Sequence, residues 1–500
     1  MPAFIWLAAS VGFASLLSRA LYLIYRHPLA NIPGSKLAAL STWYEAYYDL
    51  FAAPAGRLPW QIASLHKKYG PIIRIGPNEV HIDDVEFVSK FFSSSSTVKR
   101  DKHAPHQQQL GVPDAVVSTI PSSLHEVRRS ALAPFLSSTS INSRRDIILA
   151  KIENVSARLQ ACKDHGEAVN LRQLFWYMAS DIISDIAFPS GLCLLENPIL
   201  DAGHYNFQKK GQGKLLWFKH FPFLWVVLKR MPPSWLLRLD PQAAVPLNWE
   251  TRNKILAQKI MSGDSASEKV TVFHHLLASS LPAPEKKFDR VWQDAASLVG
   301  AGGETVSNTL CVTIFHLLSN PTVLSRLVDE LRIAIPDPSD PPPISVLGSL
   351  PYLSAVVQEG LRKAVGIISR FIRVDPNGFI KYRSYNLPPG TAISMSTLLV
   401  HNNPEIFPNP EKFIPERWMN TRNQGLRVED KRMMMAFGGG PRKCLGMHLA
   451  QAEIYLTLAV LFRRFEFESY ETTVRDVEPM YDSLMPLPWE GSKGVRVMVK

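Results

Sequence analysis

Near its carboxyl end the chain carries the run FGGGPRKCLG, Phe437 to Gly446, in which one cysteine, Cys444, follows a glycine-rich bend. An apolar helical pattern, Met447 to Phe462, begins directly after the run. Backbone N–H donors, nearby positive charge and the positive end of a helix all stabilise a thiolate and lower the pKa of a cysteine. Glycines permit close backbone approach, and Arg442 and Lys443 bring charge. The run indicates a loop that presents a thiolate to a metal, with a buried inert cysteine as the alternative.

The rest of the composition is that of a large globular protein. The 500 residues are 46% hydrophobic and 20% charged, and no linker or internal repeat divides them. The other cysteines, Cys162, Cys193 and Cys311, are scattered and form neither a disulfide framework nor a zinc spacing. A net charge of +11 favours an acidic partner or an anionic membrane surface. Nucleic acid is not expected, because no dense Lys/Arg stripe with interleaved aromatic residues occurs.

The amino terminus predicts a membrane anchor. The first 18 residues carry no charged side chain, and the apolar character continues to Tyr25. A membrane-spanning helix needs about 20 such residues. Basic residues follow this segment and none precedes it, so the positive-inside bias places the rest of the chain in the cytosol. We expect residues 1–26 to be a single-pass anchor and residues 27–500 one catalytic domain, with a cleaved signal peptide as the alternative.

Hydrophobic periodicity predicts a mainly α fold with a minor β part. Strand and turn signals occur in Pro71–Asp84 and in Arg373–Ser396. Apolar residues recur at spacings of three and four, as on one face of a helix, in Arg128–Leu136, Leu171–Phe188, Val291–Leu318 and Pro351–Val365.

A further stretch, Leu215–Leu239, is dense in Trp, Phe and Leu with interspersed Lys and Arg. This composition suits a pair of helices lying in a membrane interface. A buried core hairpin is the alternative, and the pattern alone favours neither.

Three glycines interrupt the helical segment LVGAGGETVS, at a cost of about 1 kcal/mol each relative to alanine. We interpret them as thinning one helix face so that a large flat group can lie against it. Glu304 and Thr305 are expected to project close to Ala301, by their spacing of three and four residues. A carboxylate and a hydroxyl there suit proton relay to a bound ligand. A kinked helix in which Thr305 bonds its own backbone is the alternative.

A possible ion-pair network joins two further segments. Glu359 and Arg362 stand three residues apart in a predicted helix, which places them on one face. The proline-punctuated segment Phe407–Trp418 ends near a second arginine, Arg417. We expect Arg417 to clamp Glu359 from the other side and so to order the segment that leads to Cys444.

Taken together, these motifs resemble the cytochrome P-450 superfamily of haem-thiolate monooxygenases. The family's haem loop reads F-x-x-G-x-R-x-C-x-G, and this sequence fills all of its fixed positions. They are occupied by Phe437, Gly440, Arg442, Cys444 and Gly446.

The other family motifs are also present. The oxygen-binding pattern A/G-G-x-D/E-T-T/S is met from Ala301 to Thr305 and departs from the family at Val306. The resemblance identifies Glu359 and Arg362 as the E-x-x-R pair and Arg417 as the arginine of the P-E-R-W/F loop, all with structural roles.

The resemblance also implies contacts to the haem propionates. His125 and Arg129 match positions on the helix over one haem edge, with histidine where many members carry tryptophan. Arg373 matches the propionate arginine, and Arg370 is a nearby competitor. The match extends from Pro33 to Leu487 and is most similar to membrane-bound fungal enzymes of secondary metabolism, including terpenoid oxygenases.

The resemblance implies a haem b cofactor with Cys444 as axial iron ligand, and Thr305 and Glu304 as catalytic residues for inserting one oxygen atom from O2 into a lipophilic substrate. Electrons would come from NADPH through a flavoprotein reductase, with cytochrome b5 as a second candidate donor, at the endoplasmic reticulum membrane. Two alternatives remain open: a haem-thiolate isomerase or dehydratase that needs no oxygen, and a non-enzymatic haem-binding protein.

Two surfaces are further expectations from the resemblance. The reductase would dock on a basic face, around Arg128, Lys431, Arg432 and Lys443. The walls of the substrate pocket would be Asp101–Ser123, Leu215–Leu239, Ser297–Val299, Val365–Ser369 and Ser483–Leu487. Their apolar character indicates a lipophilic substrate without specifying its skeleton.

Overall fold

The fold is described here from a computed structural model. It describes residues 2–92, 99–107, 109–197, 214–241, 244–262, 270–419, 426 and 431–500. Met1 of the predicted anchor and Gln108 of the predicted pocket walls lie outside these residues.

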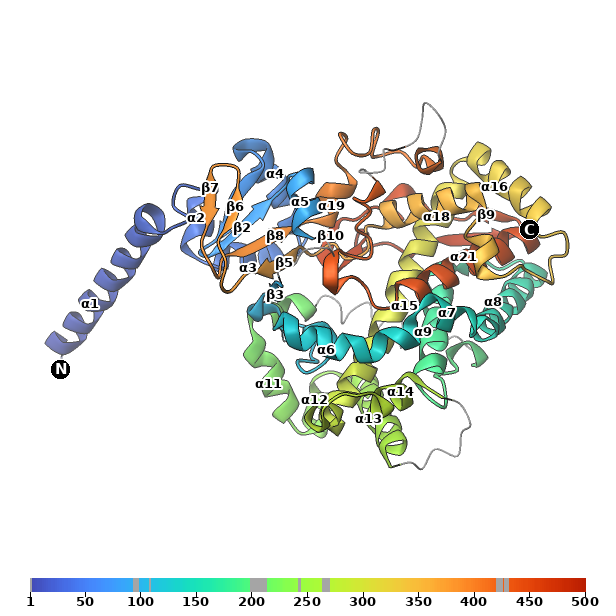
Figure 1. Cartoon of the computed structure of the whole chain (residues 1–500), viewed down its shortest axis with the longest axis horizontal. Coiled ribbons are helices and arrows are strands. Elements are labelled where there is room, and N and C mark those ends of the chain that lie inside the picture. Colours follow the sequence, from blue (N-terminus) through green and yellow to red (C-terminus); the bar gives the residue numbers. More distant parts are fainter. Residues whose placement is uncertain are drawn as a thin grey trace.

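Helices dominate the chain (Figure 1), as the periodicity predicts. Those before residue 200 are α1 (Pro2–Leu21), α2 (Lys36–Leu40), α3 (Trp43–Ala46), α4 (Leu58–Tyr69), α5 (Val85–Phe91), α6 (Ser122–Leu132), α7 (Ser138–Asn142), α8 (Arg145–His165) and α9 (Leu171–Ala187). The later ones are α11 (Pro222–Arg230), α12 (Pro233–Leu239), α13 (Ala244–Met261), α14 (Val272–Ala278), α15 (Phe288–Leu318), α16 (Pro321–Ala334), α17 (Ile344–Leu347), α18 (Pro351–Ala364), α19 (Thr397–His401) and α21 (Met447–Arg464). Residues 214–220 are also helical.

The β part is small. Its strands are β1 (Ile72–Gly76), β2 (Glu79–Ile82), β3 (Asp101–Lys102), β4 (Val169–Asn170), β5 (Phe371–Val374), β6 (Ile380–Tyr382), β7 (Tyr385–Leu387), β8 (Ala392–Met395), β9 (Phe467–Ser469), β10 (Tyr481–Ser483), β11 (Met485–Leu487) and β12 (Arg496–Val499). A five-stranded sheet has the order β1-β2-β8-β5-β3. Within it β3 pairs antiparallel with β5, which sets Lys102 opposite Arg373.

The main core surrounds α15, which runs through the middle of the body (Figure 1). Helices α9, α18 and α21 all pack against it. Nearly every side chain of α9 is buried, and the side chain of Asn170 caps this helix by accepting from the N–H groups of Arg172 and Gln173. The predicted helices Leu171–Phe188, Val291–Leu318 and Pro351–Val365 are therefore confirmed, with ends shifted by at most three residues.

The amino-terminal helix projects from the body (Figure 1). Its last turn, Tyr22–Arg26, is π-helical, and the segment Phe4–Arg26 is 23 residues long and apolar enough to cross a membrane. At 1.5 Å per residue it spans about 34 Å, close to the thickness of a bilayer core. The helix therefore fits a membrane anchor. At its base Arg74 donates a 2.7 Å hydrogen bond to the carbonyl of Leu23, which ties the helix to β1.

The aromatic stretch is not a buried hairpin. Helices α11 and α12 contain no buried residue, and Phe223 and Trp235 are about 60% exposed. This exposure leaves the interfacial interpretation of Leu215–Leu239 as the one that fits the structure.

Candidate active site

Cys444 lies in a tight loop that ends at the first turn of α21. Gly438 and Gly440 take left-handed φ angles of 70° and 68°, which glycine adopts without strain. The Cys444 N–H donates a 2.8 Å hydrogen bond to the Phe437 carbonyl and closes the loop. Gly446 is the residue that caps α21. The structure thus brings these motif residues together around Cys444.

The loop does not produce a free thiolate by itself. One side of Cys444 is exposed, but protein surrounds it closely, and this desolvation raises the pKa of its thiol above the usual value. The Gly446 N–H and the charges of Arg129 and Lys443 oppose the shift without cancelling it. The expectation that the loop lowers the pKa of this cysteine is therefore wrong for the chain alone. Coordination to a metal ion would favour the thiolate and oppose this shift.

Five basic side chains gather beside this loop and form what we term the cation cluster. Burial first, and then the charges of its four neighbours, lower the pKa of one member, the buried His125, to about 3. These neighbours come from β3, α6, β5 and the turn 440–442, and they are Lys102, Arg129, Arg373 and Arg442.

Repulsion and burial act on the other members as well. Burial and the nearby guanidinium groups lower the pKa of Lys102 to about 7 and that of Arg373 to about 9. Burial lowers the pKa of Arg442 to about 10, although the carboxylate of Asp101 opposes this shift. Partly buried cations around a neutral, buried His125, with so little opposing charge, predict an anionic ligand.

Backbone carbonyls hold the cluster in position. Arg442 donates to the carbonyls of Thr119 and Ile120 at 2.7 and 2.6 Å, while its Nε has no partner among the described residues. Arg129 donates to the carbonyl of Lys443, next to the cysteine, at 2.7 Å. The cluster and the thiol therefore belong to one site.

The structure also distinguishes Arg370 from Arg373, the two candidates for the contact to a haem propionate. Arg370 pairs with Glu45 at 2.8 Å and with Glu79 at 2.7 Å, so its charge is already neutralised. Arg373 belongs to the cation cluster. Sequence reasoning missed Lys102, because its place beside Arg373 depends on the β3–β5 pairing of segments about 270 positions apart.

Haem b fits these residues. It is flat and carries two carboxylates on one edge, which match a cation cluster holding an unpartnered Arg442 Nε, and its iron accepts a thiolate such as Cys444. We infer that Lys102, His125, Arg129, Arg373 and Arg442 hold the carboxylate edge.

The helix α15 places Glu304 and Thr305 on different faces. Thr305 Oγ1 donates to the Ala301 carbonyl at 3.1 Å on an exposed face of the helix. Glu304 is buried and forms an ion pair with Arg172 of α9, which also donates to Asn308 at 2.8 Å. The expectation that both side chains lie close to Ala301 holds for Thr305 alone.

Two of the three glycines of α15 serve a different purpose from the predicted one. A Cβ on Gly302 would lie 2.9 Å from Ile183, and one on Gly303 would lie 2.4 Å from the Ser180 hydroxyl, both on α9. Of the three glycines, only Gly300 would place a Cβ with no described atom within 4 Å. Two of the three glycines therefore permit close helix packing, and the buried Val306 occupies the same core side.

The predicted ionic network is present and fully buried. Glu359 accepts from Arg362 at 3.0 and 2.8 Å and from Arg417 Nε at 3.2 Å. Trp418 Nε1 and the Ile414 N–H complete its partners at 2.8 and 2.9 Å. Burial alone would raise the pKa of Glu359, but the arginines hold it below its usual value.

The network reaches the cysteine loop through His401, which sequence reasoning missed. His401 Nδ1 lies 3.0 Å from the Arg362 carbonyl, and its Nε2 accepts from the Met435 N–H at 3.0 Å. Burial and the Arg362 charge lower the pKa of His401 to about 3, so the imidazole is neutral and able to accept. Met435 lies two residues before Phe437, so the network around Glu359 orders the cysteine loop as predicted.

The predicted reductase surface needs correction at one residue. Arg128 forms an ion pair with Glu285 at 2.6 Å and donates to the Thr119 hydroxyl at 2.8 Å, and its side chain is 11% exposed. It is therefore part of the interior. Arg432 is exposed, and Lys431 and Lys443 are partly exposed.

A family model described as "Cytochrome P450" matches residues 43–488. The chain belongs to the cytochrome P-450 family. This confirms the resemblance stated from the motifs, and with it the mainly α fold and the haem-thiolate class of the site.

Several fungal relatives cover nearly the whole chain. Cytochrome P450 monooxygenase MO6277 of Ascocoryne sarcoides is 38% identical over 98% of both chains. Tryptophan 6-hydroxylase fscE of Fusarium equiseti is 36% identical over 97% of this chain and 95% of its own. Conidiogenone synthase PchP450 of Penicillium rubens is 33% identical over 97% of both. Their names describe oxidising and biosynthetic enzymes, which favours an oxidoreductase over a haem carrier.

Proposed function

We propose that this P-450 inserts one oxygen atom from O2 into a lipophilic substrate of fungal secondary metabolism, by hydroxylation or epoxidation. The observation that carries the proposal is that the Cys444 loop lies beside the partly buried cation cluster and is linked to it by the hydrogen bond from Arg129 to the Lys443 carbonyl. When bound, haem b would be held by Cys444 through its iron and would supply the chemistry that activates dioxygen.

The chain's own residues hold and orient that chemistry. The cation cluster would neutralise the two carboxylates of the cofactor, and this pairing would offset the repulsion among its partly buried cations. The brace of Glu359, Arg362 and Arg417 fixes the loop, so the Cys444 sulfur stays in one place as the metal binds.

Proton delivery is assigned to α15. The Thr305 hydroxyl lies on the exposed face of the helix, where it can give up its bond to the Ala301 carbonyl and order a water. The carboxylate of Glu304 is held by Arg172 on the buried side. Glu304 therefore takes part in proton delivery only after it leaves Arg172 and takes up a proton from water, and we assign it the role of a gated proton relay.

The substrate class rests on the apolar walls and on the relatives. One relative is named for hydroxylating tryptophan and another for synthesising conidiogenone, so related enzymes take dissimilar molecules. For this chain the proposal is limited to a lipophilic small molecule.

Membrane and redox partners complete the proposal. Residues 1–26 form a single-pass anchor in the endoplasmic reticulum, and residues 27–500 form the cytosolic haem domain. Electrons come from NADPH through a flavoprotein reductase that docks near Arg432 and Lys443, with cytochrome b5 as a second donor. The exposed positive charges there suit an acidic partner.

The experiment that tests the proposal is a spectrum of the ferrous carbon monoxide complex in Cys444→Ser. We expect loss of the strongly red-shifted Soret band, because a hydroxyl replaces the thiolate ligand. Cys193→Ser, which removes an exposed cysteine elsewhere, should keep the band. A red-shifted band in Cys444→Ser would refute the ligand assignment.

A second test separates the monooxygenase from its alternatives. Product formation against a panel of terpenoids and indole compounds should require NADPH, reductase and oxygen together. Product formed without oxygen would favour an isomerase or dehydratase.

A further inference from the structure

The stretch of residues 214–241 lies loosely on the body of the enzyme. All of its residues are described, and only Leu216 and Lys219 among them are buried. A segment with so few buried contacts opens locally at low free-energy cost. The buried Lys219 is unusual in such a stretch, since a buried ammonium is unfavourable unless carboxylates surround it.

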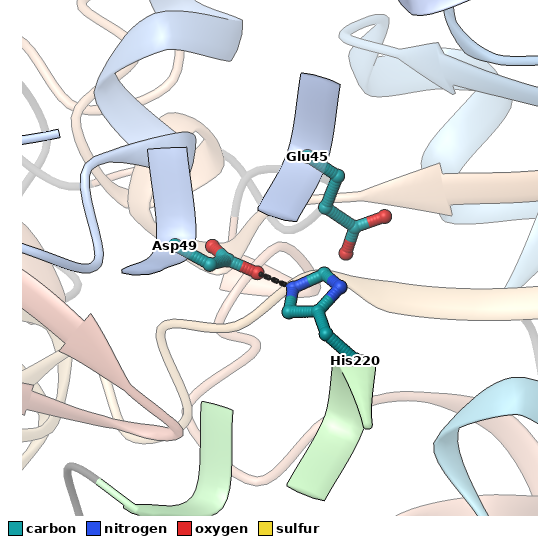
Figure 2. A group of neighbouring side chains, drawn as sticks. All are labelled: Glu45, Asp49 and His220. Atoms are coloured by element: carbon teal, nitrogen blue, oxygen red, sulfur yellow. Dashed lines mark hydrogen bonds and ion pairs between the residues drawn. The ribbon is translucent and has the colours of Figure 1, made fainter. Parts of the chain in front are cut away.

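Lys219 has such surroundings. Its Nζ lies 2.7 Å from Asp49 Oδ2 and also forms an ion pair with Glu45. The neighbouring His220 places Nε2 2.8 Å from the same Asp49 oxygen (Figure 2). Asp49 is completely buried. We term Glu45, Asp49, Lys219 and His220 the ionic latch, because two of them belong to residues 43–51 and two to the loosely held stretch.

A metal site is the competing interpretation of these residues. Ligand atoms of Glu45, Asp49 and His220 lie within 4.8 Å of one another, as in a site for a divalent cation. However, the Lys219 ammonium contacts both carboxylates, and Arg370 binds Glu45 as well at 2.8 Å. Protein cations already neutralise the acids, so we do not assign a metal here.

The body side of the latch is tied to neighbouring elements. Arg370 joins Glu45 to Glu79 of β2, which ties the latch to the five-stranded sheet. On another side, the Asp49 carbonyl accepts from the Gly56 N–H at 2.9 Å, and the Gly56 carbonyl accepts from the Asp482 N–H at 2.8 Å. The Asp482 carboxylate in turn accepts from the Ser369 hydroxyl at 2.6 Å. Ser369 belongs to one expected wall of the substrate pocket, and Asp482 directly precedes another. The latch therefore borders the pocket.

Another contact of the stretch lies on another pocket wall. Gly111 has a φ of 69°, and a Cβ there would lie 2.5 Å from the ring of Trp225 of α11. The loop that carries Gly111 reaches α15, where Gln293 Oε1 accepts from the Asp114 N–H at 2.9 Å. The loosely held stretch thus closes over the pocket loop at Trp225 and is fastened at Lys219.

We propose that the ionic latch holds residues 214–241 closed over the substrate pocket, and that Lys219 and Asp49 are positioning residues controlling passage of bulky ligands. The inference rests on the proposed function, since the pocket walls come from it. Ligands small enough to diffuse past a closed stretch should not depend on the latch.

The test uses the haem-loaded full chain and two ligands that bind haem iron. Clotrimazole is bulky and imidazole is small, and stopped-flow Soret shifts report the association rate of each. In Lys219→Met we expect clotrimazole to associate faster by on the order of tenfold, because the closed state loses its buried ion pairs. The imidazole rate should stay within about twofold of the parent.

Two further variants keep the test decisive. Lys219→Met leaves two buried carboxylates short of one cation, so the double variant Lys219→Met/Asp49→Asn, which removes one charge of each sign, repeats the test in a less charged interface. Lys151→Met is the matched control, since Lys151 is another buried lysine, 3.1 Å from Asp185 and distant in sequence from the latch. It should change neither rate.

Hydrogen–deuterium exchange supplies a readout that needs no haem ligand. Amides of residues 214–241 should exchange faster in both latch variants and not in Lys151→Met. Unchanged exchange and unchanged clotrimazole rates in the double variant would overturn the latch. A parent protein without a thiolate-type haem spectrum would instead overturn the proposed function, and the exchange result would still decide whether the stretch is fastened at Lys219.

Discussion

Two arginines three positions apart, Arg370 and Arg373, have opposite electrostatic surroundings. Burial alone would lower the pKa of Arg370, but Glu45 and Glu79 raise it well above the usual value. Burial and the Arg442 charge lower the pKa of Arg373 to about 9. An odd spacing along an extended chain puts side chains on opposite faces, so one arginine meets the acidic latch and the other the cation cluster.

The first prediction concerns haem retention in Arg373→Gln. Removing a guanidinium from the cation cluster weakens the neutralisation of the haem carboxylates, so haem should transfer to excess apomyoglobin faster, by on the order of tenfold. Loss of haem is followed at the Soret band. Arg332→Gln, which removes an exposed arginine paired with Asp329, serves as the control and should not change the rate. Equal rates in both variants would remove Arg373 from the haem site.

The second prediction is a pH effect at Asp482. Burial, and then the Asp49 charge, raise the pKa of this carboxyl to about 6. Because the folded state holds its proton more tightly than the unfolded state does, Asp482 destabilises the fold above pH 6, and this penalty shrinks as the pH falls toward 4. Both of its hydrogen bonds, from the Ser369 hydroxyl and the Leu484 N–H, end on Oδ1, which an asparagine retains.

Asp482→Asn should therefore raise the free energy of unfolding at pH 8 by up to about 3 kcal/mol, with a smaller gain at pH 4.5. Urea unfolding of variant and parent at both pH values measures the difference. A loss of stability at pH 8, or a gain that does not vary with pH, would contradict the assigned pKa of Asp482.

At the scale of elements, periodicity predicted where α15 lies but not what surrounds it. The expected range Val291–Leu318 differs from the observed Phe288–Leu318 by one turn. The expected role was wrong for Gly302 and Gly303, which pack against α9, because spacing shows that residues share a face and not which element covers that face. The partner of Glu304 is Arg172, 132 positions earlier, and no local pattern reveals such a pair.

The ionic brace could be predicted more fully, for a physical reason. Glu359 and Arg362 stand three apart on one helix, so their contact is local and can be read from spacing. The histidine that extends the brace to the cysteine loop was missed, because His401 acts through the backbone groups of Arg362 and Met435. Because almost every residue carries the same backbone N–H and C=O groups, no sequence pattern reveals a contact made through them.

The third prediction compares two glycines of α15. Gly303→Ala should lower the free energy of unfolding by about 1–3 kcal/mol, because its Cβ would meet Ser180 and lie 3.0 Å from the Trp176 ring nitrogen. Gly300→Ala meets no described atom within 4 Å and should raise stability by up to about 1 kcal/mol through helix propensity. Thermal unfolding followed by circular dichroism compares them. Similar shifts in both variants would show that Gly303 is not at a packing contact.

At the scale of the whole molecule, the anchor and the exposed aromatic side chains lie toward one end of the body. Helix α1 projects from the same end at which α3 and α11 lie (Figure 1). Trp43 of α3 lies 5.8 Å from Phe221 and Phe51 lies 5.9 Å from Trp217, between ring centroids. We term the exposed residues Trp43, Tyr47, Phe51, Trp217 and Phe223 the aromatic surface. Such a surface suits the interface of the membrane that α1 enters.

The last prediction is that the enzyme binds membranes through two independent contacts. A chain lacking residues 2–21 keeps Leu23, whose carbonyl accepts from Arg74, so the body should fold. This truncated chain should still sediment in part with vesicles containing anionic lipid, because the aromatic surface and the net positive charge remain. Adding Trp217→Ser and Phe223→Ser should weaken that binding about tenfold or more, whereas Ile333→Ser, at an exposed apolar residue of α16, should leave it unchanged. If the truncated chain stays wholly in solution, α1 alone holds the enzyme on the membrane, and the aromatic surface needs another explanation.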